Sequence, residues 1–417
     1  MKITNIQSIE ILDSRGNPTV RTFIELENGL KASASVPSGA STGKYEAVEL
    51  RDNDNKRYKG KGVLQAVSNV NSILAKNLRG MEIEDIEKID QKMIEIDGTE
   101  NKSKLGANAI LSVSLAAIRV LSLVRKQPLW KTINEYYFAD LKPNFPRLMV
   151  NVINGGRHAN WNFDIQEFMI SPKINQPSKS VRISAEIFHS IGKTLKENNY
   201  SILVGDEGGY SPSLKSNSDA FESIIKAVNI SGYKLTIDVD LAIDVAASEL
   251  YENGAYQFKK EGRKLTTDEL INYYLDLRNE YPIFSFEDPF AQDDWEGFKK
   301  FTQRLEAINK SSSLVVGDDL YTTNPLRIKR GIKEKTTNTV LIKPNQIGTV
   351  LETIEAIKIS KESDFKIVIS NRSGETEDPF IADLAYGVAA DFIKTGSMNR
   401  SERLCKYNRL IEIENGQ

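Results

Sequence analysis

The stretch LVVGDDLYTTNPLRIKRGIKEKTTNTVLIK, residues 314–343, contains two short apolar runs, LVVGDD and VLIK, that each end in a charged side chain. The polar segment between them is long enough for one amphipathic helix. Short apolar runs that alternate with amphipathic helices are typical of parallel βα units. This stretch therefore predicts two neighbouring parallel strands, each with a charged group at its carboxyl end.

The same pattern continues in both directions along the chain. The runs LAID, FSFED, IVISNRS and FIK also close on charged residues, which gives six such ends: Asp244, Glu287, Asp318, Lys343, Arg372 and Lys394. An open doubly wound sheet would collect strand ends at one edge. A closed ring is favoured because it lets six ends in series meet at one place, as in a (β/α)₈ barrel. We predict such a TIM-like barrel over residues 138–417.

The first part of the chain has a different pattern. Asn28-Gly29 lies between two alternating runs, which is a strong hairpin signal, with Ile24 and Leu26 on one face before the turn. A loop rich in Gly and Ser, PSGASTG (37–43), follows, and residues 62–78, 84–94 and 105–124 have helical spacing. Strands followed by helices predict a small α+β domain over residues 1–137. The two prolines in FADLKPNFPRL (138–148) mark the connection to the barrel.

Composition excludes several classes of protein. The chain of 417 residues carries 55 Lys and Arg against 57 Asp and Glu, a net charge of −2, which argues against a dedicated nucleic-acid binder. The single cysteine, Cys405, excludes an intrachain disulfide and fits a cytoplasmic location. The two histidines are too far apart for HExxH-type metal chemistry. The most apolar stretch, Leu105–Val124, contains Asn108 and Arg119, so we expect a buried helix and no membrane span.

The charged strand ends suggest a chemistry. Asp244, Glu287 and Asp318 would place three carboxylates at one barrel mouth, where they repel one another unless a cation neutralises them. Ligation by oxygen alone favours a hard ion, Mg²⁺ first. Three separate helix caps or surface charges are the alternative.

The basic residues at the predicted strand ends each allow two interpretations. Lys343 is either a surface lysine or a base whose pKa a nearby divalent ion would lower. Arg372, Ser373 and Lys394 suit a phosphate or carboxylate group, or they form salt bridges at the barrel rim.

Two further segments carry acidic residues. GDEGGY (205–210) places Glu207 before two glycines, and DIQEFM (164–169) adds Glu167 at what we expect to be another strand end. Paired carboxylates suit general acid–base work, although Asp and Glu are common. His158 lies in the Gly-rich segment NGGRHAN, where contact with solvent or ligand is more common than burial in the core.

Taken together, these motifs resemble the enolase family, of the bacterial type, along nearly the whole chain. The segments that carry the resemblance are DSRGNPTV (13–20), PSGASTG (37–43), DGTENKSKLGANAILSVS (97–114), NVINGG-x-HA (151–159), DIQEFMI (164–170), GDEGGY (205–210), ED (287–288), GDDL (317–320), LIKPNQIGT (341–349), RSGETED (372–378), KTGS (394–397) and RSERL-x-KYN (400–408). A single one of these motifs could occur by chance, but a dozen in the same order is highly specific.

The resemblance implies a fold and a set of roles. It implies an α+β cap on a barrel with one antiparallel strand, a mobile PSGASTG loop and two Mg²⁺ ions in each active site. Lys343 matches the base, Glu207 the acid and Glu167 the carboxylate that assists at the leaving hydroxyl. The implied metal ligands are Asp244, Glu287 and Asp318 for the first ion and Ser41 for the second. The implied substrate-binding positions are Ala40, Ser41, His158, Gln166, Glu167, Ser370, Asn371, Arg372, Ser373 and Lys394.

The implied reaction is reversible dehydration of 2-phosphoglycerate, a small phosphorylated three-carbon acid, to phosphoenolpyruvate. Hydroxide leaves poorly, so Glu207 has to be protonated when it acts, and we expect burial to raise its pKa. The resemblance also implies a homodimer or a ring of dimers.

One position departs from the family pattern. Enolases usually have His before Arg-Ser, and this chain has Asn371, which cannot become cationic near neutral pH. Three hypotheses stay open: a working enolase, a paralogue that acts on a related phospho- or phosphono-acid, and a catalytically weak enolase-like binding protein. The intact base and metal carboxylates speak against the third.

Overall fold

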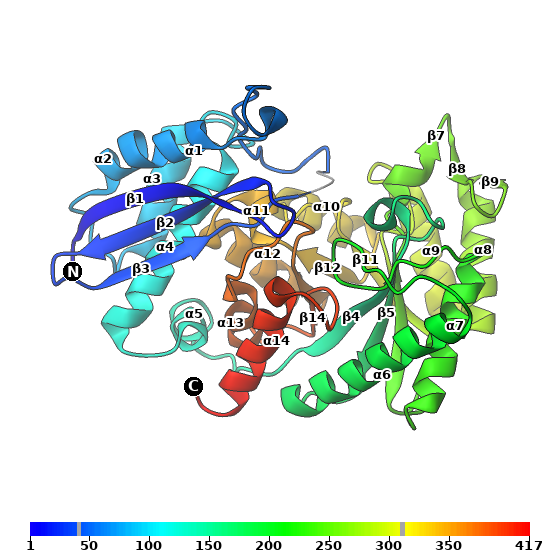
Figure 1. Ribbon diagram of the computed structural model, residues 1–417. Coiled ribbons are helices and arrows are strands. Elements are labelled where there is room, and N and C mark those ends of the chain that lie inside the picture. Colours follow the sequence, from blue (N-terminus) through cyan, green and yellow to red (C-terminus); the bar gives the residue numbers. More distant parts are fainter. Residues whose placement is uncertain (40–42, 309–312) are drawn as a thin grey trace.

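A computed structural model describes residues 1–39, 43–308 and 313–417. Figure 1 shows two parts side by side, an N-terminal cap domain in blue and cyan and a C-terminal barrel in green to red. The predicted boundary between residues 137 and 138 falls between the last cap helix and the first barrel strand. The positions Ala40 and Ser41 lie outside the described residues.

The cap begins with an antiparallel sheet of order β1-β2-β3, formed by β1 (Ile3–Leu12), β2 (Pro18–Leu26) and β3 (Lys31–Ser35). The Asn28-Gly29 turn joins β2 to β3 as predicted, and Gly29 has a φ of +82°, a conformation that a side chain would strain. Ile24 and Leu26 are buried on the face that the helices cover.

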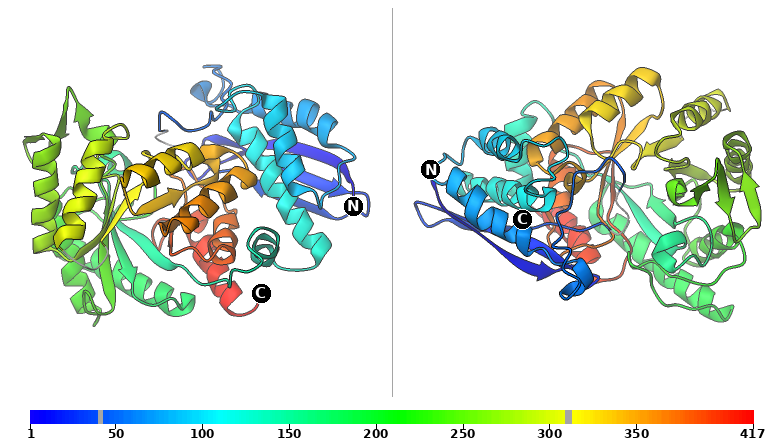
Figure 2. Two further views of the ribbon diagram at one scale, coloured as in Figure 1. Left: turned by 180° about the vertical axis from the view of Figure 1, so that it is seen from behind. Right: turned by 90° about the horizontal axis from the view of Figure 1, so that it is seen from above.

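The cap helices pack on one face of this sheet, as the rear view in Figure 2 shows. A continuous helical segment with a π-turn in its middle spans residues 64–78, close to the predicted 62–78. The helical elements of the cap are α1 (Leu64–Ser68), η2 (Asn69–Leu74), α2 (Ala75–Leu78), α3 (Ile86–Asp97), α4 (Ala107–Arg125), α5 (Leu129–Tyr137) and the short η1 (Tyr58–Gly60).

Helix α4 is long and apolar enough to cross a membrane, with a mean hydropathy of 1.9. It packs against β2 and β3 on one side and against α11 (Pro344–Ile347) of the barrel on another, so 83% of its apolar window is buried. This burial explains its composition, and the helix is a core element as expected.

The barrel is closed by eight strands in the order β10-β11-β12-β13-β14-β4-β5-β6. The strands are β4 (Arg147–Asn154), β5 (Glu167–Pro172), β6 (Val239–Asp244), β10 (Ile283–Glu287), β11 (Leu314–Gly317), β12 (Thr339–Ile342), β13 (Lys366–Ser370) and β14 (Phe392–Lys394). The predicted enolase-type α/β barrel is therefore confirmed.

Strand β5 differs from the regular (β/α)₈ pattern, because it runs antiparallel to both β4 and β6. Our expectation that Glu167 ends a strand is wrong, since it is the first residue of β5. The reversed direction nevertheless brings it to the same mouth, where it pairs in register with Asp244, the last residue of β6. Hydrophobic periodicity carries no information on strand direction, so only the resemblance pointed to an antiparallel strand.

Helices surround the barrel on the outside. They are α6 (Pro177–Glu197), α7 (Asn217–Ile230), α8 (Thr267–Glu280), α9 (Trp295–Ile308), α10 (Pro325–Glu334), α12 (Val350–Glu362), α13 (Phe380–Gly387) and α14 (Ser401–Glu414). A small sheet of β7 (Tyr251–Glu252), β8 (Ala255–Phe258) and β9 (Arg263–Leu265) precedes α8, and two short 3₁₀ turns are η3 (Gly156–Ala159) and η4 (Ala247–Leu250). Helix α8 begins with a capping box in which Thr266 and Glu269 each accept a hydrogen bond from the other's backbone N–H.

Candidate active site at the barrel mouth

The barrel mouth, the end at which the parallel strands finish, gathers the charged residues that the sequence singled out. Asp244, Glu287 and Lys394 are the last residues of β6, β10 and β14. Asp318 and Lys343 directly follow β11 and β12, and Arg372 lies two residues beyond β13. The alternative that these charges are unrelated helix caps or surface groups is wrong, because Asp244, Asp318, Lys343, Arg372 and Lys394 line one pocket and Glu287 is buried beside it in contact with Lys394.

Lys394 lies at the centre of the carboxylate cluster. Its Nζ contacts Asp244 Oδ2 at 2.9 Å, Glu287 Oε2 at 2.8 Å and Glu167 Oε2 at 3.0 Å. Burial alone would lower the pKa of Lys394, but these carboxylates raise it well above its ordinary value. Lys394 is therefore a fixed cation.

One lysine does not neutralise all the acids of the mouth. Burial raises the pKa of Glu287 well above its ordinary value, and repulsion from Asp244 and Asp318 adds to the rise. Burial and repulsion from Asp318 likewise raise the pKa of Asp319 to about 7. Raised carboxylate pKa values of this kind mean that the mouth favours additional positive charge.

Lys343 makes an ion pair with Asp318 Oδ2, and Asp318 Oδ1 accepts a hydrogen bond of 2.8 Å from the Gln346 side chain. Burial is the largest single effect and lowers the pKa of Lys343, but Asp318 and Glu287 together raise it above its ordinary value. We expected a lowered pKa beside a divalent ion, and among the protein's own groups the balance is the opposite. Lys343 can act as a base only after this pairing is weakened.

An acid pair lies beside the lysines. His158, Glu167 and Glu207 bring one ligand atom each to within 4.8 Å of one another, and His158 Nδ1 lies 3.1 Å from Glu167 Oε1. His158 therefore faces the site, as expected for a residue in that Gly-rich segment.

The two carboxyls of this pair differ in proton affinity. Burial, with repulsion from Glu207, raises the pKa of Glu167. Burial also acts to raise the pKa of Glu207, but His158, Arg403, Lys394 and Lys343 overcome it and lower the value to about 2. Our expectation of a raised pKa for Glu207 is wrong in this arrangement, and Glu167 is the carboxyl with the higher proton affinity.

The predicted anion-binding residues line the other side of the pocket. The Arg372 guanidinium holds Glu46 of the cap through both nitrogens, at 2.7 and 3.2 Å, and also contacts Asn345 Oδ1 at 3.0 Å. Ser370, Ser373 and Gln166 line the same pocket. An incoming phosphate would compete with Glu46 for Arg372.

Asn371 is buried beside these groups, with 2% of its surface exposed. Its Nδ2 donates a hydrogen bond of 3.0 Å to the carbonyl of Arg372. Its Oδ1 is buried and accepts no hydrogen bond from the described residues. An unsatisfied buried acceptor is costly. Because Asn371 lines the pocket, its Oδ1 is available to a hydrogen-bond donor bound there.

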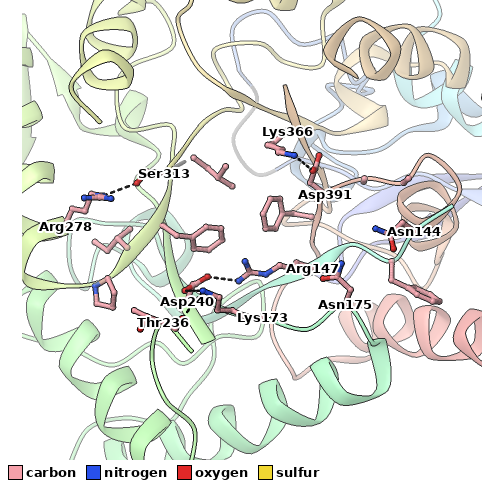
Figure 3. Close-up of a pocket in the computed structure, with 18 residues that line it drawn as sticks. Asn144, Arg147, Lys173, Asn175, Thr236, Asp240, Arg278, Ser313, Lys366 and Asp391 are labelled. Atoms are coloured by element: carbon pink, nitrogen blue, oxygen red, sulfur yellow. Dashed lines mark hydrogen bonds and ion pairs between the residues drawn. The ribbon is translucent and has the colours of Figure 1, made fainter. Parts of the chain in front are cut away.

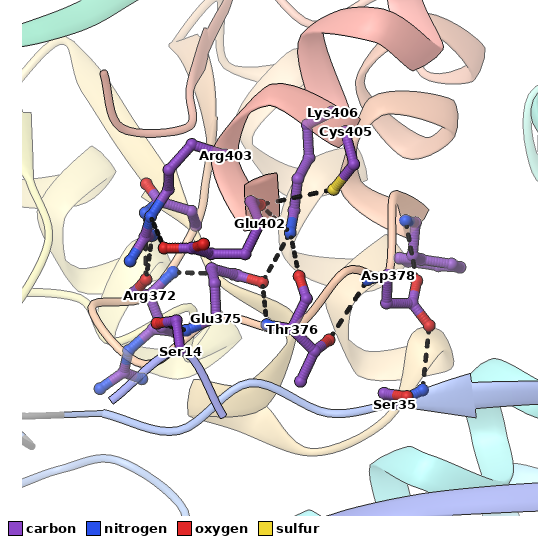
Figure 4. A network of polar contacts seen from close by, with 12 residues as sticks. Ser14, Ser35, Arg372, Glu375, Thr376, Asp378, Glu402, Arg403, Cys405 and Lys406 are labelled. Carbon is purple, nitrogen blue, oxygen red and sulfur yellow. Dashed lines mark hydrogen bonds and ion pairs between the residues drawn. The ribbon is translucent and has the colours of Figure 1, made fainter. Parts of the chain in front are cut away.

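A buried arginine of α14 holds two loops of the mouth together, and Figure 4 shows its contact with the loop that carries Arg372. Arg403, which is fully buried, donates hydrogen bonds of 2.6 Å to the carbonyls of both Arg372 and Ser373, and one of 3.2 Å to the carbonyl of Asp206. Lys406, one turn further, holds Glu375 Oε2 at 2.9 Å. The loop that carries Arg372 and the loop that carries Glu207 are thus tied to one helix.

Three residues at the mouth were not predicted. Asp288 braces the backbone after β11 by accepting hydrogen bonds from the N–H groups of Asp318 (2.9 Å) and Asp319 (2.7 Å). Asp288 and Asp319 each adjoin a predicted ligand in the pairs ED and GDD, which is the signal that could have found them. Nothing in the spacing of the chain indicates that Glu46 meets Arg372, because the contact joins two domains.

The donor set of the mouth fits a hard divalent cation. Among the described residues, the group of carboxylates whose oxygens lie within 4.8 Å of one another is Asp288, Asp318 and Asp319. Of the predicted ligands it contains Asp318, whereas Asp244 and Glu287 are both paired with Lys394. All of these donors are oxygens, which a hard cation prefers. Burial, with repulsion from neighbouring carboxylates, raises the pKa of Glu287 and Asp319, so a bound cation would stabilise their charged forms. The mouth therefore contains a carboxylate cluster that is compatible with a divalent metal ion.

Fold and site together define a class: a capped α/β barrel whose mouth carries a lysine, an acid pair and clustered carboxylates. Comparison with known protein families agrees with this class. The description "Enolase, N-terminal domain" matches residues 3–133, and "Enolase, C-terminal TIM barrel domain" matches residues 143–416. The chain belongs to the enolase family, which supports a lyase activity.

Proposed function

We propose that this protein is a Mg²⁺-dependent hydro-lyase that interconverts 2-phospho-D-glycerate and phosphoenolpyruvate. The observation that carries the proposal is the arrangement of the mouth, where Lys343 and the Glu167–Glu207 pair line one pocket together with Lys394 and Arg372. These groups can remove a proton, protonate a leaving hydroxyl and hold a multiply charged acid.

The residues proposed to hold the first Mg²⁺ are Asp244, Glu287 and Asp318. Such an ion supplies positive charge to a substrate carboxylate, on which a second negative charge develops when the neighbouring carbon loses its proton. Pairing of a lysine base with Mg²⁺ is a known pattern of the enolase superfamily.

Lys343 is the proposed base. Its Nζ accepts the proton from the carbon next to the carboxylate, and for this it has to be neutral. In the described structure Asp318 stabilises the charged ammonium. Asp318 is also a proposed metal ligand, so a role in ion binding would draw it away from Lys343 and favour the neutral amine.

The acid pair is proposed to act at the leaving hydroxyl. Glu207 keeps a low pKa because four cations face it, and a substrate with several negative charges would engage those same cations. Binding of substrate should therefore raise the pKa of Glu207, and Glu167, whose pKa is already raised, lies close enough to pass a proton to it. His158 orients Glu167 through the contact at 3.1 Å.

The substrate anion is proposed to bind between Lys394, Arg372 and Ser373. Lys394 stays charged and can face the carboxylate, while the planar guanidinium of Arg372 suits a phosphate group. The contact of Arg372 with Glu46 of the cap indicates that the cap borders the same pocket.

A second candidate rests on Asn371. Its buried acceptor Oδ1, where the family usually has a histidine, suits a paralogue that acts on a related phospho- or phosphono-acid with a hydrogen-bond donor at that point. The chemistry of proton removal would be the same, and the substrate would differ.

The test is the appearance of phosphoenolpyruvate by ultraviolet absorbance after 2-phosphoglycerate is added with Mg²⁺. We expect turnover that stops in excess chelator and returns when Mg²⁺ is restored. Turnover that persists in chelator would contradict the metal assignment. Absence of turnover in Mg²⁺-loaded protein would favour the paralogue.

A further inference from the structure

A second pocket lies at the opposite end of the barrel, where the parallel strands begin (Figure 3). We name it the floor pocket and define it by Arg147, Lys173, Arg278, Lys366, Asp240 and Asp391. Its cavity volume is about 640 Å³, within the range of about 300–1,000 Å³ that small-molecule sites occupy. It is separate from the mouth, since it shares no lining residue with that pocket.

The floor pocket carries more positive than negative charge. Its lining includes four cationic side chains and two carboxylates, in a chain whose net charge is −2. Figure 3 shows that Arg278, Lys366 and Lys173 approach from different sides of the pocket. The surplus of positive charge is therefore confined to this pocket.

Both carboxylates are fully engaged by the protein. Asp240 Oδ2 accepts a hydrogen bond of 3.0 Å from Arg147, and its Oδ1 lies 3.5 Å from Lys173 Nζ. Asp391 accepts two hydrogen bonds, one of 2.9 Å from Lys366 Nζ to Oδ1 and one of 3.0 Å from the backbone N–H of Ile367 to Oδ2. Each carboxylate oxygen therefore already has a partner in the chain, so the pairing with cations partly offsets the negative charge that an incoming anion would meet.

The cations keep donors to spare. Arg147 uses Nε and Nη2 for Pro172, Ser171 and Asp240, and its Nη1 donates to none of the described residues. Lys366 has three N–H donors, and within the described part of the chain it donates to Asp391. Its side chain is 54% exposed, so a ligand can reach it.

A purely structural role explains part of this pocket. The Arg147 guanidinium lies over the rings of Phe284 and Phe392, at 5.0 and 5.7 Å, and closes the apolar interior of the barrel. Charges at this end of a barrel commonly serve stability. That role accounts for Arg147 and Asp240, and Lys366 and Arg278 also have partners in the chain, Asp391 and Ser313 Oγ. What stability does not require is that four cations line one open cavity with only two carboxylates among its described lining residues.

We propose that the floor pocket is a binding site for a small dianion of the phosphate-monoester type. A dianion matches a surplus of two positive charges, and lysine and arginine donors are suited to phosphate oxygens. The site is independent of the function proposed for the mouth, so either proposal can fail alone.

The test measures the number of inorganic phosphate ions bound per chain by equilibrium dialysis at low ionic strength, with the full-length protein. The first variant is Lys366→Met. The matched control is Lys300→Met, which removes a comparably exposed lysine, paired with Asp268, from the outside of the barrel. Lys173→Met provides a second variant of the pocket, in case the first is unstable.

Loss of one charged contact should weaken phosphate binding at the floor about tenfold to hundredfold. We expect Lys366→Met and Lys173→Met each to bind one phosphate ion fewer than Lys300→Met, which should match the native protein. Added salt should weaken this binding in the native protein. Equal phosphate binding by all four proteins would overturn the proposal.

Discussion

Replacement of Arg403 by lysine tests whether the mouth depends on the clamp that α14 provides. Arginine makes three hydrogen bonds to the carbonyls of Arg372, Ser373 and Asp206. A lysine keeps the charge, but it lacks the planar fork that reaches two carbonyls of one loop and one of another. Arg403→Lys should therefore release one or two charge-assisted hydrogen bonds without removing the cation.

The expected magnitude follows from these contacts. At about 1.5–3 kcal/mol for each hydrogen bond to a charged group, the free energy of unfolding should fall by about 3 kcal/mol. Displacement of the loop that carries Arg372 and Ser373 should also lower kcat/KM about a hundredfold, since a shift of about 1 Å is enough for such a loss. Both KM and kcat should change, because the clamp touches the proposed phosphate site and the loop of Glu207.

The control comes from the same helix. Arg409 holds Asp383 through two hydrogen bonds of 2.9 Å and contacts neither mouth loop. Arg409→Lys should lower the midpoint of denaturant unfolding and leave KM and kcat unchanged. If Arg403→Lys lost stability like this control and kept native kinetics, the clamp would be structural only and our reasoning would be wrong.

Two further predictions concern single buried side chains. Asn371→His should raise kcat/KM for 2-phosphoglycerate about tenfold to hundredfold, because it recovers one charge-assisted hydrogen bond. A lower kcat/KM at every pH between about 6 and 9 would instead favour the paralogue, whose own substrate requires Asn. Asp90 of α3 is buried and accepts a hydrogen bond from the backbone of α12. Burial raises its pKa from 3.8 to about 7. The folded state therefore binds the Asp90 proton more tightly than the unfolded state does. Its contribution to stability is therefore present below pH 4 and is lost as the pH rises through about 7. Denaturant unfolding should show the stability of the native protein falling by about 4 kcal/mol relative to Asp90→Asn over that range, and parallel curves for the two proteins would contradict the assignment.

Much of the barrel could be predicted from local pattern. A parallel strand buried on both faces leaves a short apolar run, and the charge that follows it points to the mouth, which is why Asp244, Glu287 and Lys394 are found where expected. The direction of β5 leaves no such trace, so Glu167 was placed at the correct mouth but at the wrong end of its strand.

Contacts between segments that are distant in the sequence limit how much of the site could be predicted. The pairing of Arg372 with Glu46 depends on how the cap meets the barrel, and the low pKa of Glu207 depends on cations from four separate segments. Spacing along the chain identifies the residues of such a network. It does not give the sum of burial and charge that decides which carboxyl holds the proton.

The most direct test of the proposed function follows the C2 proton of 2-phosphoglycerate in deuterated water with Mg²⁺ present. The native protein should both exchange this proton and form phosphoenolpyruvate, Lys343→Ala should do neither, and Glu207→Gln should exchange the proton without dehydration. This order is expected because proton removal precedes loss of hydroxide. Exchange that survives in Lys343→Ala, or native protein that leaves 2-phosphoglycerate unchanged, would contradict the account.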